Sequence, residues 1–196
     1  MARVAKKPKV IIIAGPNGAG KSTVAPRILA NSEFVDVFVN ADVIARGLSA
    51  LDSESMAISA GRIMLARLRE LAAERQSFAF ETTLASRSFA PWISGLIDSG
   101  YDFHRYFIAL KSAKLATKRV RKRVLSGGHD VPVDTIHRRY RYGICNLFEL
   151  YIPIASRWWV WDNSNSDAAF EIASGSREVE TVFDVKRWAQ LKAGVK

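Results

Sequence analysis

The stretch VIIIAGPNGAGKST, residues 10–23, decides the fold of this 196-residue chain. Its apolar start, Val10 to Ala14, predicts a buried strand, and GPNGAGKST follows directly in the pattern GxxxxGK[ST]. Glycines in such a loop let successive N–H groups turn inward around a phosphate, and a helix that begins near Lys21 adds its positive N-terminal end. The stretch therefore predicts a strand, a phosphate-binding loop and a helix that together hold a nucleoside triphosphate.

Each residue of this loop has an expected role in binding ATP and Mg²⁺. Lys21 is expected to reach the β- and γ-phosphates, and the Ser22 hydroxyl to ligate Mg²⁺. The remaining positions are expected to line the phosphates: Gly15, Pro16, Asn17, Gly18, Ala19, Gly20 and Thr23. The pattern predicts the nucleotide, but it does not indicate what receives the phosphate.

Length and composition favour one compact domain over residues 1–196, since 48% of the residues are hydrophobic and the chain is short for two ordinary domains. The one cysteine, Cys145, cannot form an internal disulfide, which is typical of a reducing compartment. The basic N-terminus lacks the pattern of a signal peptide, and no apolar run is long enough to cross a bilayer. We therefore expect a soluble, cytoplasmic protein without a membrane partner.

Positive charge is concentrated in one segment. The chain carries 29 lysines and arginines against 19 acidic residues, and ten of these basic residues lie between Lys111 and Arg141. Most such lysines form a solvated helix face. Arginines suit phosphate better because their donors fork onto its oxygens. We expect a lid over about residues 119–139, hinged at SGGHDVP (126–132), that brings Arg123, Arg138 and Arg139 to the γ-phosphate and Arg119 to the adenine.

Strand and helix signals alternate along the chain. Strands are expected at 10–14, 34–39, 77–81, 102–110, 157–161 and 168–173, and helices at 22–30, 53–76, 89–98, 112–125, 134–151 and 178–191. This alternation predicts a parallel α/β sheet with helices on both faces. In such sheets, ligands bind at the carboxyl ends of the strands.

That rule selects polar residues after the second and third expected strands. Asp42, in NADVIAR (40–46), is placed to act as a general base, or it caps the helix that follows. Glu81 could bind an acceptor hydroxyl or hold a water on Mg²⁺. Asn40, Thr82 and Thr83 are expected in the acceptor site, and the two threonines alternatively bind phosphate or cap a turn.

His129 and the tryptophans are expected to have structural roles. His129 is interpreted as a loop anchor rather than a base, and Trp158, Trp159 and Trp161 as packing residues on alternate faces of a strand.

The order GPNGAGKST, NADVIA, FETTL, RVLSGGHDVP with IHRRY, NLFELY and WDNS resembles the zeta toxin family of P-loop kinases, in a short single-domain form. The resemblance implies a fold similar to the nucleoside monophosphate kinases, with a parallel core of five to six strands and a lid. It implies ATP-dependent phosphorylation of a nucleotide sugar such as UDP-N-acetylglucosamine. By this resemblance Lys21 and Ser22 are the loop residues, Asp42 the catalytic base and Glu81 a sugar-contacting acid. Arg123 and either Arg138 or Arg139 contact phosphate, and any antitoxin is a separate protein.

Three hypotheses follow for the function. The first is a kinase for a nucleotide sugar, and the second is a kinase for another small metabolite or a nucleotide. The third is a nucleotide-dependent nucleic-acid-binding module, which the net charge of +10 suggests. The concentration of charge beside the expected γ-phosphate argues against nucleic acid as a partner.

Overall fold

A computed structural model describes residues 7–30, 35, 37–49, 55–128, 130–165 and 168–194. Its strands are β1 (Lys9–Ala14), β2 (Val37–Val39), β3 (Phe78–Thr82), β4 (Asp102–Ala109), β5 (Arg157–Asp162), β6 (Phe170–Ser176) and β7 (Glu180–Val182). Its helices are α1 (Lys21–Ala30), α2 (Ala41–Leu48), α3 (Ala57–Ala73), α4 (Phe89–Asp98), α5 (Ala113–Leu125), α6 (Val133–Asn146), the π-helix η1 (Leu147–Tyr151) and α7 (Val185–Ala193).

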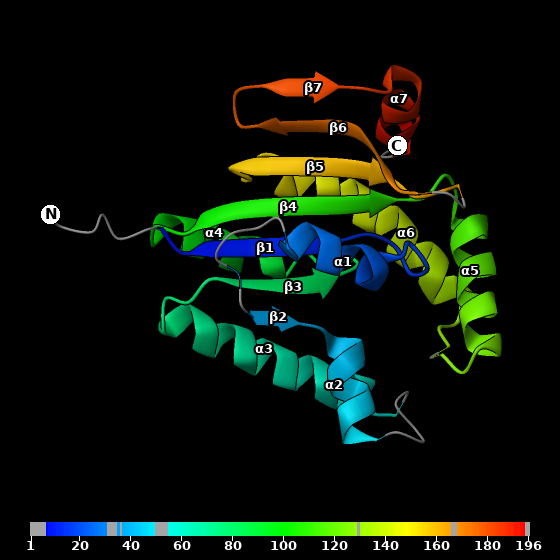
Figure 1. Cartoon of the computed structure of the whole chain (residues 1–196), viewed down its shortest axis with the longest axis horizontal. Coiled ribbons are helices and arrows are strands. Elements are labelled where there is room, and N and C mark those ends of the chain that lie inside the picture. The colour runs from blue at the N-terminus through cyan, green and yellow to red at the C-terminus, as the bar shows by residue number, and fades with distance from the viewer. Residues whose placement is uncertain are drawn as a thin grey trace, which may run out of the picture.

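The strands form one seven-stranded sheet in the order β2-β3-β1-β4-β5-β6-β7 (Figure 1). The first five are parallel, as the alternation of strands and helices predicts, whereas β6 and β7 are antiparallel. The expected parallel core is therefore present with five strands, and β6 and β7 extend it in the antiparallel direction at one edge. The connection from β5 to β6 is too short for a helical crossover, so the chain can only turn back on itself.

Helices cover both faces of the sheet, as predicted. On one face, Ile11 and Ile13 of β1 pack with apolar residues of α1 and α5. On the other face, Val10 and Ile12 pack with α3, α4, the end of α6, η1 and α7. This alternation along β1 shows why its run of apolar residues has no polar face, since both sides of a central parallel strand are buried.

The C-terminal elements differ from the expected helix over 178–191. Its first part is the edge strand β7, and α7 begins only after Asp184, whose side chain accepts a hydrogen bond from the Arg187 amide at 2.8 Å. Polar and apolar residues alternate in EVETV (178–182), which is typical of a strand, but its two glutamates also suit an exposed helix. The expected helix over 134–151 is continuous but changes its winding, because its last turn is the π-helix η1.

Other boundaries are shorter than expected. Among the described residues of the second expected strand, Val37–Val39 form a strand, and α3 begins at Ala57. Phe34, Asp36, Ser53 and His129 lie outside the described residues, so the role of His129 as a loop anchor stays a prediction. Within the described part of the chain, none of the helices combines the length and the apolar character that crossing a membrane would need.

The topology brings the predicted site residues to one edge. In Figure 1 the arrowheads of β1, β3, β4 and β5 point to the side where α5 stands. The phosphate-binding loop follows β1 there, α2 follows β2, and the ETT segment ends β3. The register confirms this adjacency, because Ala14 of β1 lies beside Thr82 of β3.

Candidate active site

The glycine-rich loop has the conformation that its sequence predicts. Gly15 adopts a φ of 145°, and a Cβ at this position would lie 2.3 Å from the carbonyl oxygen of Ile108. Gly20 adopts a φ of 82°, and a Cβ here would lie 2.7 Å from Asn163 Nδ2. Side chains at these two positions are excluded both by backbone conformation and by contact, so the loop stays close to β4 and to the end of β5.

Lys21 begins α1 with its side chain folded back under the loop. Only 8% of it is exposed, and its Nζ donates to the Pro16 carbonyl oxygen at 3.1 Å. The same atom lies 3.6 Å from Glu81 Oε1. Burial lowers the pKa of Lys21, while the charges of Glu81 and Asp42 act in the opposite direction. The ammonium group is therefore held within the loop, next to the space that phosphates would fill.

Glu81 is the centre of the hydrogen-bond network. Its Oε2 accepts from the Ser22 hydroxyl at 2.7 Å and from Asn40 Nδ2 at 2.9 Å, and its Oε1 faces Lys21. One carboxylate of β3 thereby contacts the start of α1 and the residue that follows β2. No group of three or more histidine, cysteine or acidic side chains suited to a metal occurs among the described residues. The oxygens of Ser22 and Glu81 nevertheless fit Mg²⁺, which typically takes few protein ligands together with substrate phosphates.

Asn40, rather than Asp42, caps helix α2. Its backbone is extended at a φ of −135°, and its Oδ1 accepts from the amides of Asp42 at 2.8 Å and Val43 at 3.3 Å. The alternative that Asp42 serves as the N-cap is therefore wrong. Asp42 lies in the first turn with an exposed side chain, and its carboxylate has no hydrogen bond or ion pair to any residue that the structure describes.

Two arginines of the expected lid act electrostatically on this site. Burial lowers the pKa of Arg139, the adjacent Arg138 adds to this effect, and Asp42 opposes it. Arg123 lies close enough to Lys21 to lower its pKa further, after the larger effect of burial. Arg138 is exposed on α6, whereas Arg139 is half-buried. The charge of Arg123 thus acts on Lys21, and that of Asp42 acts on Arg139.

Arg119 lies elsewhere, on the face of α5 toward the end of β5. Its Nη2 donates to the carbonyl oxygens of Ser164 at 3.4 Å and Asn165 at 3.2 Å. These contacts anchor the guanidinium beside the loop, and its role in holding adenine stays a prediction.

The two threonines after Glu81 shape the chain. Each hydroxyl accepts from the amide two residues later, Thr82 from Leu84 at 3.2 Å and Thr83 from Ala85 at 3.5 Å. The buried Leu84 has a φ of 57°, a strained conformation for leucine, and its carbonyl oxygen accepts from Asn146 Nδ2 at 2.7 Å. The turn that was one alternative is therefore formed, while phosphate binding and acceptor binding by these threonines stay predictions.

Residues that sequence reasoning did not select hold the site in place. Asn163 Nδ2 donates to the Ala19 carbonyl oxygen at 2.8 Å across 144 residues of sequence, and Asn146 holds the ETTL segment. Both asparagines belong to the motifs WDNS and NLFELY, so the motifs marked them without indicating their contacts. The tryptophans behave as predicted: Trp158 is buried on one face of β5, while Trp159 stacks on Tyr106 on the other face.

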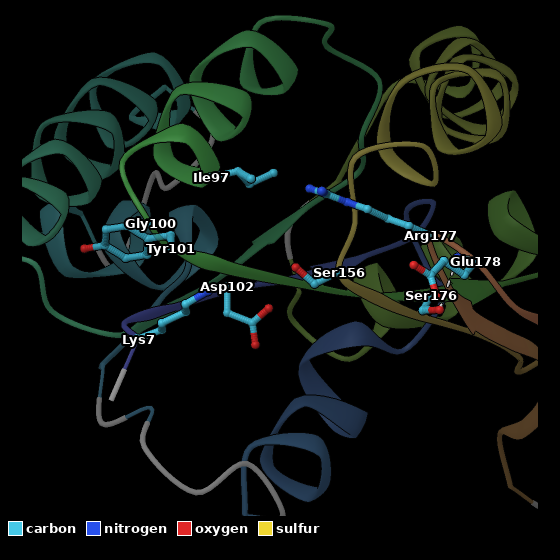
Figure 2. A pocket seen from close by; sticks show the side chains of 9 residues that line it. All are labelled: Lys7, Ile97, Gly100, Tyr101, Asp102, Ser156, Ser176, Arg177 and Glu178. Carbon is cyan, nitrogen blue, oxygen red and sulfur yellow. Dashed lines mark hydrogen bonds between the residues drawn. The ribbon is translucent and has the colours of Figure 1, made fainter. Parts of the chain in front are cut away.

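A separate hollow of about 350 Å³ opens at the opposite edge of the sheet, where β1, β4 and β5 begin (Figure 2). Its charged lining is mixed, with Lys7 and Arg177 set against Asp102 and Glu178. The predicted catalytic residues lie at the other edge of the sheet, and none of them lines this hollow.

Comparisons with known proteins agree with this architecture. An uncharacterized protein of Haemophilus influenzae is 27% identical over 132 residues, which are 67% of this chain and 92% of that protein. The crystal structure of AvrRxo1-ORF1:AvrRxo1-ORF2 with sulphate ions matches with a TM-score of 0.75 at 12% identity, over 97% of this chain and 65% of that chain. The same pair with ATP gives a TM-score of 0.74 at 13% identity, again over 97% of this chain and 65% of that one.

The chain thus spans slightly less than two thirds of the AvrRxo1-ORF1:ORF2 chain. A structure from the PezAT toxin-antitoxin system of Streptococcus pneumoniae matches with a TM-score of 0.64 at 18% identity, over 98% of this chain and 86% of that one. At these identities the similarity concerns the fold, which is that of an α/β P-loop NTPase. The family model described as AAA domain matches residues 10–141, about two thirds of the sequence. By this match the chain belongs to the AAA domain family.

Proposed function

We propose that the protein is an ATP- and Mg²⁺-dependent kinase that transfers the γ-phosphate to a hydroxyl group of a small molecule. The observation that carries the proposal is the convergence at one sheet edge of a buried lysine, a hydrogen-bonded glutamate and an aspartate whose carboxylate has no partner among the described residues. Lys21 and Glu81 are 3.6 Å apart, and the charge of Asp42 acts on the Lys21 ammonium. Asp42 differs from Glu81 in that no donor among the described residues occupies its carboxylate, which leaves it available to an acceptor hydroxyl.

The loop and Lys21 account for phosphate binding. The main-chain amides of the loop and the N-terminal end of α1 favour the β- and γ-phosphates, and Lys21 would exchange its contact with Pro16 for phosphate oxygens. Ser22 and Glu81 would hold Mg²⁺, directly or through water, which neutralises charge on the transferring group. Binding then requires Ser22 to leave its 2.7 Å hydrogen bond with Glu81 or to share it.

Asp42 is the base in this proposal because its carboxylate is accessible and free to accept a proton. A general base must come within hydrogen-bond distance of the acceptor hydroxyl, either directly or through one water. Asn40 fixes the first turn of α2, so the position of Asp42 is set by the backbone rather than by contacts of its own side chain.

Arg123 and Arg139 would neutralise the charge that develops on the γ-phosphate oxygens. Arg139 is a better candidate than Arg138, since it is the half-buried member of the pair and Asp42 acts on its pKa. Arg138 would then face the acceptor or solvent.

A nucleotide sugar such as UDP-N-acetylglucosamine is the leading acceptor, on the resemblance to zeta toxins. Glu81, with Asn40, Thr82 and Thr83 around it, would orient the sugar. The fold shared with a structure from a toxin-antitoxin system also supports a separate antitoxin protein as partner. A single domain over residues 1–196, with its lid formed by the facing ends of α5 and α6, completes the proposal.

The experiment is transfer of labelled phosphate from ATP to a panel of nucleotide sugars, nucleosides and oligonucleotides, with the wild type and Asp42→Asn. We expect label on a small acceptor, and Asp42→Asn to lower the transfer rate by about 10²- to 10⁴-fold while ATP affinity is kept. Asp98→Asn, an exposed change on α4, is the matched control and should transfer at the wild-type rate. Full transfer by Asp42→Asn would show that another group takes the proton.

A further inference from the structure

A second cavity, of about 360 Å³, lies between α6, α7 and the connection from β4 to α5. It is lined by Lys111, Tyr140, Ile144, Arg187, Leu191 and Gly194, among others. The proposed kinase chemistry uses none of these residues. The volume is within the range of small-molecule sites, although at its lower end.

The charged lining of this cavity is entirely positive. Lys111 and Arg187 both face it, and no carboxylate is among the lining residues that the structure describes. Arg187 is paired behind the lining with Asp162, which is only 2% exposed and accepts a hydrogen bond from Arg187 Nε. Asp162 therefore balances one of the two cations, and one unit of positive charge is left for a ligand.

The Arg187 guanidinium is also short of acceptors. Its Nη2 is buried and has no hydrogen-bond partner among the described residues. The neighbouring Tyr140 hydroxyl donates to the carbonyl oxygen of Leu110 at 2.8 Å, and its oxygen also interacts with the Arg187 guanidinium without satisfying Nη2. A buried guanidinium N–H that lacks an acceptor costs free energy, so a ligand oxygen that reached it with a small side-chain shift would be bound favourably.

Both cations of the cavity are attached to the segment that supports the phosphate-binding loop. Arg187 is bonded to Asp162, and the Lys111 amide donates to the Ser164 hydroxyl at 2.7 Å. Between these two residues, Asn163 donates to the carbonyl oxygen of Ala19 in the loop at 2.8 Å. A shift of the Arg187 side chain would therefore act on Asp162, and a shift of the Lys111 main chain would act on Ser164, which are the two neighbours of the asparagine that holds the loop.

We propose that this cavity binds a small carboxylate with a compact apolar body, and that this binding changes the affinity of the loop for nucleotide. A monocarboxylate matches the single unbalanced positive charge, whereas a phosphate monoester carries more charge than the cavity neutralises. Ile144 and Leu191 provide an apolar wall for the rest of the ligand. The proposal is independent of what the kinase phosphorylates, because it concerns a site apart from Asp42 and Glu81.

Hexanoate is a suitable probe, with 1-hexanol as the uncharged control, followed by ¹H–¹⁵N NMR of the whole protein. We expect saturable shifts of amides in α6 and α7 with hexanoate and not with hexanol. Lys111→Glu should weaken hexanoate binding at least about tenfold, while Lys114→Glu, which also changes an exposed lysine but one outside the lining, should leave it within about twofold. Arg187→Lys keeps the charge opposite Asp162 but loses the forked donors, and should also weaken binding.

Nucleotide affinity is the second measurement. Titration calorimetry of a non-hydrolysable ATP analogue, with and without saturating hexanoate, should give different dissociation constants, and the analogue should change hexanoate affinity by the same factor. Shifts confined to the phosphate-binding loop, or shifts that survive Lys111→Glu, would overturn the site. Binding at α6 and α7 without any change in analogue affinity would overturn the coupling.

Discussion

Replacing Asn40 with alanine tests the network around Glu81 more sharply than any change to Glu81 itself. Asn40 performs two tasks with one side chain: Oδ1 caps α2 through the amides of Asp42 and Val43, and Nδ2 donates to Glu81 at 2.9 Å. Loss of an N-cap costs about 1 kcal/mol. Loss of a hydrogen bond to a charged group costs about 1.5 kcal/mol at the low end, which fits here because Ser22 and Lys21 still bind Glu81.

We therefore expect Asn40→Ala to lower the free energy of unfolding by about 2–3 kcal/mol, measured by urea denaturation at an unchanged m-value. For a domain of this size, that corresponds to a fall in Tm of roughly 4–12 °C. Exchange of the Asp42 and Val43 amides with solvent deuterium should accelerate, since both lose their acceptor. Phosphate transfer should also slow, because Glu81 and the first turn of α2 both become less well positioned.

Asn40→Ser is the matched control, because serine caps helices as well as asparagine but is too short to reproduce the amide contact with Glu81. It should cost about 1 kcal/mol less than Asn40→Ala and should retain slow exchange of the two amides. Equal losses for the two variants would refute the assignment of Asn40 as the cap. A loss below about 0.5 kcal/mol for Asn40→Ala would refute the whole network.

Two further changes follow from the packing. Gly20→Ala places a methyl group 2.7 Å from Asn163 Nδ2 at a φ of 82°. We expect the free energy of unfolding to fall by about 1–3 kcal/mol and ATP to bind more weakly by calorimetry. Unchanged ATP affinity would contradict the loop geometry. Arg105→Leu removes a fully buried guanidinium without a hydrogen-bond acceptor among the described residues, and should raise the free energy of unfolding by about 1–3 kcal/mol at pH 7. Burial lowers the pKa of Arg105 to about 9, so the unfolded chain binds this proton more tightly, and the wild type should recover stability relative to Arg105→Leu as the pH rises above about 9. A difference that stays constant up to pH 10.5 would indicate a counter-charge near Arg105.

The central part of the fold could be predicted because its signals are local. The apolar run of β1 and the loop pattern predict a strand, a turn and a helix within a few residues, and helix α4 has the bounds that its sequence predicts, Phe89–Asp98. The edge of the sheet could not be predicted in this way. Strand β7 has three residues, and its existence depends on pairing with β6, which local periodicity does not report.

The same distinction applies to the site. Lys21, Asp42 and Glu81 could be selected, because each lies at or shortly after the carboxyl end of a strand, and these ends meet at one edge of the sheet. Which of them is held by hydrogen bonds and which is left accessible could not be predicted, since that depends on contacts between distant segments. The choice of Asn40 over Asp42 as cap is a matter of backbone conformation, and the contact of Asn163 with Ala19 joins residues 144 positions apart.

These contacts separate the roles of two carboxylates that resemble each other in sequence. Glu81 receives donors from Ser22 and Asn40 and faces the Lys21 ammonium, so its oxygens are occupied and its orientation is fixed. A carboxylate held by this many donors is a good ligand or orienting group. Asp42 is exposed, and no described residue donates to its carboxylate, so a substrate hydroxyl would meet unoccupied lone pairs. For Glu81 to act as the base instead, its oxygens would have to lose the hydrogen bond from Asn40. The extended backbone of Asn40 and its cap of α2 hold this side chain beside Glu81, so the structure favours Asp42 as the base.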